Sequence, residues 1–393
     1  MADKNEITKV YDTLMRDAIS VYSKEGLLEK LLSGRKLIIK LGADPSRPDL
    51  HLGHSVVLRK LRMLQQLGHE IVFVIGDFTA MIGDPSGRSK TRVPLTFEQT
   101  RKNGETYLQQ VVKILDPEKT RITYNSEWLA KMNFSDVLAL AGKYTVARIL
   151  ERDDFAKRMA AQAPIGMHEM FYPLMQGYDS VALHADIEVG GNDQTFNLLV
   201  GRELQRDYDQ QPQEVITFPL LPGLDGVEKM SKSLDNYIGI DEPADMMYEK
   251  CMKVPDTLLE TYFKLTTDMP EVEFMPLLTT DIMAAHRRYA EQIVTLYHGA
   301  DAVDAAKARY ASVAGGGVPQ ELDEYTLPVG VQLADALKES GLAPSKGEAR
   351  RLIQGGGVKL DGEKVTEAGA CMNIPGNYVL QKGKNKFARI IIK

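Results

Sequence analysis

The stretch of residues 36–75 constrains the fold more than any other part of the sequence. Residues 71–75 form an unbroken apolar run, which is typical of a strand buried on both faces of a sheet. Residues 36–43 predict another short strand, and a helix-period stretch runs between them from Gly53 to Leu67, where Gly68 ends it. Because a strand, a helix and a strand with short links make a βαβ unit, the sequence predicts a parallel α/β sheet of the Rossmann type.

The rest of the chain divides by pattern. Residues 97–180 are mainly helical in pattern, 185–189 and 215–221 predict short strands, about 195–204 predicts a helix, and 243–312 is helical again. A Gly- and Pro-rich stretch at 314–328 is typical of a linker. We therefore predict a catalytic domain at 1–228 with a helical insertion near 105–185, a helical domain at 229–313, the linker, and a small α+β domain at 329–393.

The small C-terminal domain has its own local signals. Ser345 and Glu348 fit a capping box at the start of a short helix. Asp361-Gly362 lies between two short strand patterns, which is a strong hairpin signal, and residues 387–392 predict the last strand.

Composition narrows the class of protein. No run of about 18 apolar residues predicts a membrane span, and residues 1–9 lack the apolar core of a secretory signal. The only cysteines, Cys251 and Cys371, are far apart, which argues against a disulfide framework or a cysteine zinc site and favours the reducing cytoplasm.

Charge is distributed unevenly along the chain. The net charge is −6, but residues 331–393 hold eleven Lys and Arg against six Asp and Glu. A basic end on an acidic body favours a polyanionic partner for that end, although a solvated charged surface explains the charge equally well.

The first chemical motif follows the predicted strand at 36–43. It consists of Asp44-Pro-Ser46 and then His51-Leu-Gly53-His54, at the start of the predicted helix. A helix N-terminus presents free N–H groups to phosphate, and histidines three residues apart can donate to oxygens that gain charge in a transition state. The alternative is a pair of surface histidines in a turn.

The second motif is Lys229-Met-Ser-Lys-Ser233, which follows the predicted strand at 215–221. Two lysines three residues apart in a loop suit a pyrophosphate leaving group. Alone, the segment would be read as a charged surface loop, but its place after a nucleotide-binding βαβ unit makes the pair of motifs specific.

These two motifs resemble the signatures of class I aminoacyl-tRNA synthetases. Three segments between them resemble the tyrosyl branch of bacterial enzymes: residues 82–87 (Ile-Gly-Asp-Pro-Ser-Gly), 176–179 (Gln-Gly-Tyr-Asp) and 189–194 (Val-Gly-Gly-Asn-Asp-Gln). The C-terminal segment is similar to S4-type RNA-binding domains. The resemblance covers nearly the whole chain with collinear motifs.

The resemblance implies roles for individual residues. For tyrosine it implies Asp84, Tyr172 and Gln176 at the ammonium group, Asp179 at the phenol hydroxyl, and Gln194 nearby. For phosphate chemistry it implies His51, His54, Arg88, Arg92, Lys229, Lys232 and Ser233. For ATP it implies Asp44, Ser46, Gly53, Gly191, Asp193, Met230 and Ser231, with Asp193 on the ribose. Turn chemistry around Asp84 and a core role for Tyr172 are the structural alternatives.

One position departs from the pattern. Lys40 stands where the better-known bacterial form has a tyrosine that also contacts the substrate hydroxyl, as in a divergent bacterial group. Leu41 and Val57 likewise replace polar residues that contact the nucleotide. Phenol recognition is therefore expected to depend more strongly on Asp179 or on groups that the sequence does not identify.

The implied reaction has two steps. ATP, expected as its Mg²⁺ complex, would activate L-tyrosine to tyrosyl-adenylate with release of pyrophosphate, and the tyrosyl group would pass to the 3′ end of tRNA(Tyr) with release of AMP. The resemblance also implies a homodimer with its interface near residues 110–170, and no metal bound by the protein itself. Rival interpretations are a tryptophanyl enzyme of the same fold, a small adenylyltransferase, and a non-catalytic RNA-binding protein.

Overall fold

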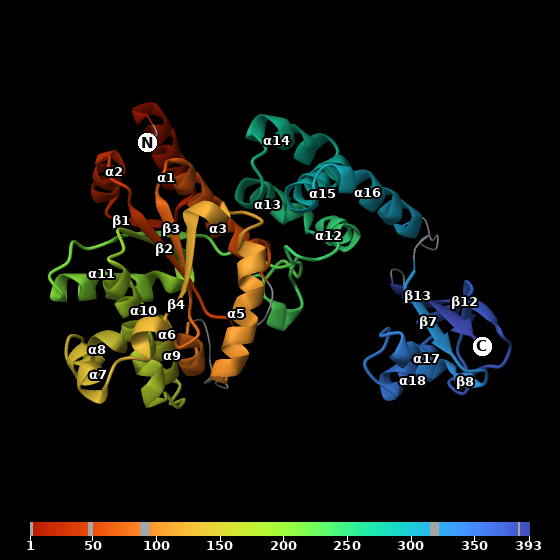
Figure 1. The fold of residues 1–393 in the computed structure, drawn as a ribbon. Helices are drawn as coiled ribbons and strands as arrows, with labels where there is room; N and C mark the ends of the chain where they lie inside the picture. The colour runs from red at the N-terminus through yellow and green to blue at the C-terminus, as the bar shows by residue number, and fades with distance from the viewer. Residues whose placement is uncertain (1–2, 46–49, 87–94, 315–321, 384–385) are drawn as a thin grey trace. The chain divides into compact units, whose positions relative to one another are not determined.

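The computed structural model describes residues 3–45, 50–86, 95–314, 322–383 and 386–393 (Figure 1). Two compact units divide the chain: Met1–Pro243 with Lys250–Ile293, and Ala244–Glu249 with Val294–Lys393. No helix in this described part combines the length and apolar character needed to cross a bilayer.

A six-stranded sheet forms the centre of the first unit, in the order β1-β6-β5-β2-β3-β4. Its strands are β1 (Ser20–Tyr22), β2 (Ile38–Ala43), β3 (Glu70–Ile75), β4 (Thr120–Tyr124), β5 (Ile187–Gly191) and β6 (Glu214–Phe218). Only β1 runs antiparallel to its neighbour; the other pairs are parallel. This confirms the Rossmann-like prediction, and β2 is the strand from which the order runs to β3 on one side and to β5 on the other.

Helices connect and cover these strands. They are α1 (Lys4–Asp17), α2 (Lys24–Leu32), α3 (Leu52–Gln66), α4 (Thr79–Ile82), α5 (Phe97–Val111), α10 (Met167–Leu183) and α11 (Thr195–Asp207). The predicted βαβ unit is present as β2-α3-β3, and Val56, Leu61 and Leu64 of α3 are buried as the periodicity required. Helices α10 and α11 pack side by side (Figure 1).

The insertion contains one strand that the sequence pattern did not predict. Between α5 and α10 lie α6 (Ser126–Leu129), α7 (Phe134–Ala141), α8 (Val146–Ile149) and α9 (Asp153–Ala160), but β4 interrupts this helical stretch. β4 adds to the free edge of β3 in parallel register. Its Thr, Ile and Tyr residues favour a strand, yet five residues are too few to stand out in a long helical window.

The helical region after β6 agrees with prediction. It contains α12 (Ala244–Cys251), α13 (Leu259–Thr266), α14 (Glu271–Thr280), α15 (Ile282–His298) and α16 (Asp301–Ala314). In the first unit Phe263 stacks on Phe274 with ring centroids 4.6 Å apart. In the second unit Tyr248 of α12 lies against Tyr310 of α16.

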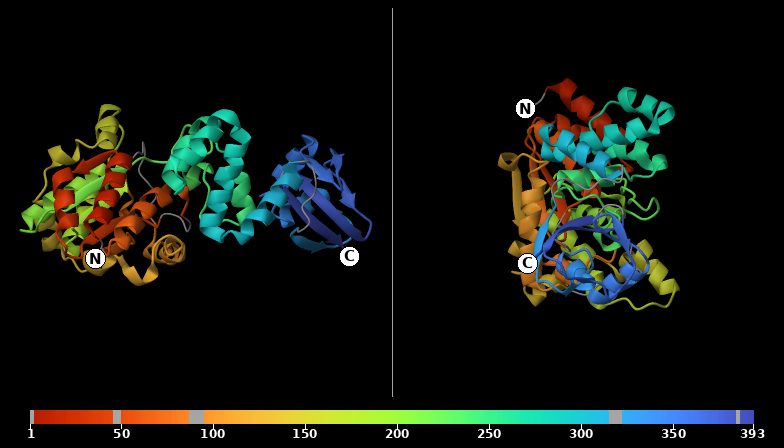
Figure 2. Two further views of the ribbon diagram at one scale, coloured as in Figure 1. Left: turned by 90° about the horizontal axis from the view of Figure 1, so that it is seen from above. Right: turned by 90° about the vertical axis from the view of Figure 1, so that its right-hand side faces the viewer.

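The C-terminal part of the second unit has a five-stranded sheet in the order β10-β9-β12-β13-β7, shown in blue in Figure 2. Its strands are β7 (Glu324–Leu327), β9 (Val358–Leu360), β10 (Glu363–Val365), β12 (Gly376–Lys382) and β13 (Lys386–Ile392), and a short pair joins β8 (Val331–Gln332) to β11 (Cys371–Met372). Helices α17 (Leu333–Glu339) and α18 (Lys346–Gln354) share its core with Leu380 and Ile390.

Local predictions for this segment hold with one correction. Asp361 and Gly362 form the hairpin turn with positive φ angles of 48° and 87°, and Ser345 Oγ accepts from the Glu348 N–H at 3.2 Å at the start of α18, which is one of the two bonds of the predicted capping box. The linker, however, was predicted to reach Pro328, and this is wrong. Residues 324–327 form β7, which pairs in parallel with β13 because that strand offers it a free edge.

Candidate active site

The predicted site residues gather where β2 and β5 end, at the point where the strand order reverses. In open α/β sheets ligands bind outside the carboxyl ends of strands at such a point. Asp44 follows β2, and Asp193 and Gln194 lie in a short turn (Asn192–Gln194) directly after β5. One Asp44 oxygen accepts from Thr79 Oγ1 at 2.7 Å and the other from the Tyr172 hydroxyl at 3.0 Å, so Asp44 fixes the direction of Tyr172.

The two histidines form the start of α3. His51 is its N-cap, with Nδ1 accepting from the Gly53 N–H at 3.2 Å, and His54 Nδ1 accepts from the His51 N–H at 3.2 Å. Burial first, and then His54, Lys232 and Lys229, hold the pKa of His51 well below its usual value. Burial and then Lys232 lower the pKa of His54 to about 4. Both imidazoles are therefore neutral at pH 7, with Nε2–H left as the hydrogen-bond donor.

The Lys-Met-Ser-Lys-Ser segment lies against this helix start. The backbone following it pairs with the histidine motif, since Leu52 donates to the Ile238 carbonyl at 2.9 Å and His51 forms a bridge with Gly239. A Cβ added to Gly53 would come within 2.9 Å of the His51 ring, so glycine leaves room for this imidazole, and Met230 lies at ordinary contact distance from the same position. The fold thus brings together two motifs that are 175 residues apart in sequence.

Asn236 organises the same segment and was not predicted. It is buried, its Oδ1 accepts from the Ser231 N–H at 2.7 Å, and its Nδ2 donates to the Lys229 carbonyl at 3.2 Å. Lys229 in turn forms an ion pair of 2.9 Å with Asp193. Asp193, the residue predicted to bind the ribose, therefore lies beside the Lys-Met-Ser-Lys-Ser segment. A Cβ on Gly191 would come within 2.8 Å of Asp193 Oδ1.

A second carboxylate, Asp84, is held by three groups. Its oxygens accept from Gln194 Nε2 at 2.8 Å and from the Ser86 N–H at 2.9 Å. The buried guanidinium of Arg152 lies 3.9 Å away and donates to Ser86 Oγ at 3.0 Å and Asn197 Oδ1 at 2.8 Å. The carboxylate is thereby fixed in place, as a site for a cation requires.

Asp179 lies deeper, on the same face of α10 as Tyr172 and Gln176. Its exposed fraction is 2%, and it accepts from Trp128 Nε1 at 2.8 Å and Asn125 Nδ2 at 3.3 Å. Burial raises the pKa of Asp179 to about 7, although Lys40, Trp128 and Asn125 act to lower it. Burial, and then Asp44 and Asp84, raise the pKa of Tyr172 well above its usual value, so its phenol stays neutral.

The structure adds four residues that sequence reasoning missed: Asn125, Trp128, Arg152 and Asn236. Trp128 is the only tryptophan of the chain and could have been singled out on that ground. Asn125 and Arg152 carry no local signal, since they bond to residues distant in sequence, whereas the partners of Asn236 lie within the same loop. Of the predicted residues, Ser46, Arg88 and Arg92 lie outside the described residues, as does the side chain of Ser233.

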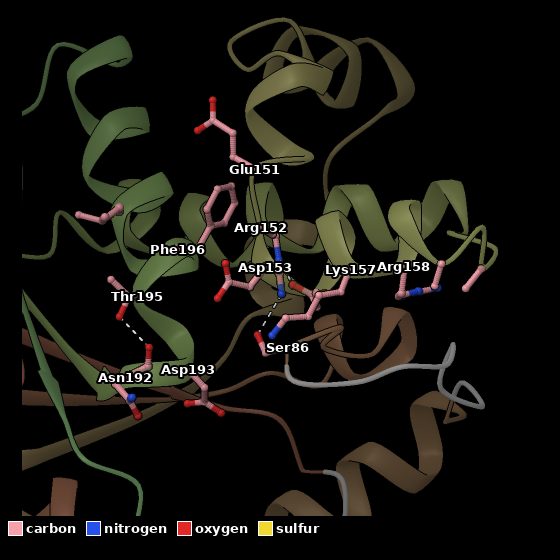
Figure 3. A pocket seen from close by; sticks show the side chains of 14 residues that line it. Ser86, Glu151, Arg152, Asp153, Lys157, Arg158, Asn192, Asp193, Thr195 and Phe196 are labelled. Carbon is pink, nitrogen blue, oxygen red and sulfur yellow. Dashed lines mark hydrogen bonds and ion pairs between the residues drawn. The ribbon is translucent and has the colours of Figure 1, made fainter.

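A cavity of about 760 Å³ borders this site (Figure 3). Ser86, Arg152 and Lys157 line it on one side and Asn192, Asp193 and Phe196 on the other. It reaches the site at Ser86 and Asp193, and neither histidine lines it. Among the side chains that can be described, no group of three or more His, Cys, Asp or Glu converges as metal ligands would.

Two family profiles match the chain. The family described as "tRNA synthetases class I (W and Y)" matches residues 32–313, and the S4 domain matches 332–370. The matched ranges cover the six-stranded sheet from β2 onward and the start of the C-terminal domain.

Curated relatives extend over nearly the whole chain. The tyrosine–tRNA ligase of Deinococcus radiodurans is 52% identical over 392 residues, covering 97% of this chain and 95% of the relative. That of Geobacter metallireducens is 55% identical over 380 residues, with 94% of each covered. Among solved structures, a C-terminally truncated mitochondrial tyrosyl-tRNA synthetase from Aspergillus nidulans aligns at a TM-score of 0.65 and 24% identity, covering 79% of this chain and 96% of that chain, which supports the fold.

Proposed function

The chain belongs to the class I tRNA synthetases of the tryptophan and tyrosine group and acts as a tyrosine–tRNA ligase, and from this premise we propose how its residues divide the reaction. The enzyme activates L-tyrosine with ATP and transfers the tyrosyl group to the 3′ end of tRNA(Tyr). No side chain needs to form a covalent intermediate. Catalysis therefore consists of positioning two substrates and stabilising the leaving pyrophosphate.

The arrangement of α10 supports the tyrosine site best. Tyr172, Gln176 and Asp179 are spaced i, i+4 and i+7, so they share one face of the helix, and all three are buried. Asp84, held by Gln194, would receive the ammonium group together with Tyr172 and Gln176. Asp179 would receive the phenol hydroxyl. Among the described residues the buried Gln176 Oε1 atom has no hydrogen-bond partner, as a donor on the substrate would require.

The triphosphate end is assigned to the residues around α3. His51 and His54 present neutral Nε2–H donors, while Lys229, Lys232 and Ser233 would approach the β- and γ-phosphates together with Arg88 and Arg92. Asp193, which is paired with Lys229 in this structure, would release Lys229 and bind the ribose hydroxyls instead. Mg²⁺ would enter with ATP, held mainly by phosphate oxygens, and would neutralise charge on the leaving group.

Amino-acid-dependent ATP–pyrophosphate exchange tests this assignment. Exchange should run with tyrosine and not with phenylalanine, because phenylalanine would leave the buried Asp179 carboxylate short of a hydrogen bond. It should not run with tryptophan, whose indole is larger than a phenol. Exchange fastest with tryptophan would contradict the assignment of Asp179 and place the chain with the other branch of its family.

Tyrosine affinity should depend on pH through Asp179. With Trp128 and Asn125 already donating to its oxygens, the carboxylate can accept the phenol O–H fully only when ionised. Because its pKa is about 7, the tyrosine KM should fall roughly tenfold from pH 6 to pH 8, and the ATP KM should not follow it. In Asp179→Asn the tyrosine KM should be high at every pH. A wild-type tyrosine KM that is flat across this range would show that Asp179 does not titrate there.

We also propose a homodimer that uses the insertion between β4 and β5. Large apolar side chains are exposed there on α7 to α10: Phe134 (77%), Leu138 (55%), Val146 (61%), Met159 (56%) and Met167 (70%). Such exposure is typical of an interface. Sedimentation should give a dimer for the wild type and a folded monomer for Phe134→Glu with Val146→Glu. A wild-type monomer at micromolar concentration would contradict it.

The cysteines Cys251 and Cys371 are both free, in keeping with a proposed cytoplasmic location.

A further inference from the structure

A charged pair lies in the middle of the six-stranded sheet, directly behind the tyrosine site. Lys40 of β2 and Glu188 of β5 are cross-strand neighbours, with Lys40 Nζ 2.9 Å from Glu188 Oε1. Their exposed fractions are 0% and 1%. The reaction assigned above uses neither residue.

The pair is joined to α10 at one turn only. Lys40 Nζ donates to the Gln176 carbonyl at 3.0 Å and to Ser180 Oγ at 2.9 Å, and Ser180 Oγ donates to Glu188 Oε2 at 3.0 Å. Two of the three Lys40 N–H donors thus bond to α10, and its charge faces Glu188 Oε1. The turn that it holds runs from Gln176 to Ser180 and therefore includes Asp179.

Stability alone does not explain such a pair. Removing two charges from water costs free energy that their attraction offsets only in part, and apolar residues of similar volume often serve as well. A buried pair with a specific geometry beside a site is a candidate for a functional role. Here the Lys40 cation lies behind Asp179, so the pair can act on the residue proposed to accept the substrate hydroxyl.

We propose that Lys40 and Glu188 act as positioning residues for phenol recognition: they hold the Gln176–Ser180 turn, and with it Asp179, against the sheet. This inference rests on the proposed role of Asp179 as the acceptor for the substrate hydroxyl. It explains how a chain with lysine at position 40 can recognise a phenol without a tyrosine hydroxyl there. Lys40 contributes through its charge and its contacts to α10.

The groups around Asp179 support this role for Lys40 and Glu188. Asn125 and Trp128 donate to its oxygens, Tyr172 lies on its own helix, and the charged groups that act on it are Lys40 of β2 and Glu188 of β5. Asn125 Nδ2 also donates at 3.0 Å to the Oγ1 atom of Thr79, a residue of α4. Lys40 lowers the pKa of Asp179 and Glu188 raises it, with Lys40 the larger of the two effects.

The test replaces both charges at once, so that neither is left buried alone. Lys40→Met with Glu188→Gln should raise the tyrosine KM about tenfold at pH 7 in pyrophosphate exchange, with the ATP KM unchanged. The pH at which the tyrosine KM changes should move up, because the variant removes both charges and Lys40 lowers the Asp179 pKa more than Glu188 raises it. The single variant Lys40→Arg, which keeps the charge beside an intact Glu188, should have a pH profile close to that of the wild type.

The chain offers a matched control in a second buried pair. Lys30 of α2 and Glu214 of β6 are each 5% exposed, with Nζ and Oε1 3.8 Å apart, and neither contacts α10 in the described structure. Lys30→Met with Glu214→Gln should keep the wild-type tyrosine KM and pH profile. The inference fails if the Lys40 variant keeps the wild-type profile, or if the control variant changes in the same way.

Two further measurements keep the outcome decisive. If the Lys40 double variant does not fold, Ser180→Ala removes the hydroxyl that joins the pair to α10 and should raise the tyrosine KM about threefold; an unchanged value overturns the inference. Wild-type enzyme that does not exchange with tyrosine would refute the proposed function itself. Exchange that Asp179→Asn impairs and the Lys40 variant does not would refute only this inference.

Discussion

Lys232→Ala is expected to slow tyrosyl-adenylate formation by about 10²–10³, while tyrosine affinity stays close to that of the wild type. The lysine would meet negative charge that develops only as pyrophosphate leaves. Loss of a contact made only in the transition state lowers the rate constant of the step and not the ground-state affinity. An effect of this size corresponds to about 2.7–4 kcal/mol.

The geometry around Lys232 supports this expectation. Its charge is close enough to lower the pKa of both His51 and His54, so the lysine lies with the two imidazoles where we propose that the phosphates bind. Pre-steady-state measurement of adenylate formation gives the rate, and equilibrium binding gives the tyrosine Kd. Lys264→Ala, which removes an exposed lysine paired with Glu260 on α13, is the control and should be neutral. An unchanged rate for Lys232→Ala would mean that the segment is only surface.

The parts of the fold and of the site that could be predicted from sequence are those whose signal is local. The apolar run of β3, the His-Leu-Gly-His helix start and the Asp361-Gly362 turn each depend on residues a few positions apart. The order of the two signature motifs then restricted the reaction class. The fold adds what order alone does not contain: Leu52 bonded to Ile238, which holds one motif against the other.

Three of the four residues that were missed, Asn125, Trp128 and Arg152, depend on contacts across the chain. Arg152 reaches Ser86 across 66 positions, and Trp128 reaches Asp179 across 51. Read in sequence, Lys40 is a single cation in an apolar strand, and only the pairing of β2 with β5 shows that it faces Glu188. Likewise β7 is a strand because β13, more than 60 residues later, offers it a free edge. No window around residues 324–327 contains that information.

That strand changes how the C-terminal domain should be removed. A chain ending at Pro328 would keep β7 without its sheet, so the cut belongs in residues 315–321. Ending at Ala314 keeps α16, whose Arg309 pairs with Asp245 of α12 at 2.7 Å. Every residue assigned to tyrosine or ATP lies before residue 234. The shortened enzyme is therefore expected to form tyrosyl-adenylate at nearly the full-length rate.

Charging of tRNA by the same chain should fall by roughly 10²-fold, because the removed domain carries the net positive charge. Five of its basic side chains are exposed on α18, β9 and β10: Lys346, Arg350, Arg351, Lys359 and Lys364. If these contact phosphates, charging by the full-length enzyme should weaken as salt rises, and Arg350→Gln with Arg351→Gln should lower that salt dependence without affecting pyrophosphate exchange. Circular dichroism must first show that the shortened chain is folded. A folded chain that charges tRNA at the full-length rate would show that residues 329–393 do not bind it, and the uneven charge would then be explained as a solvated surface.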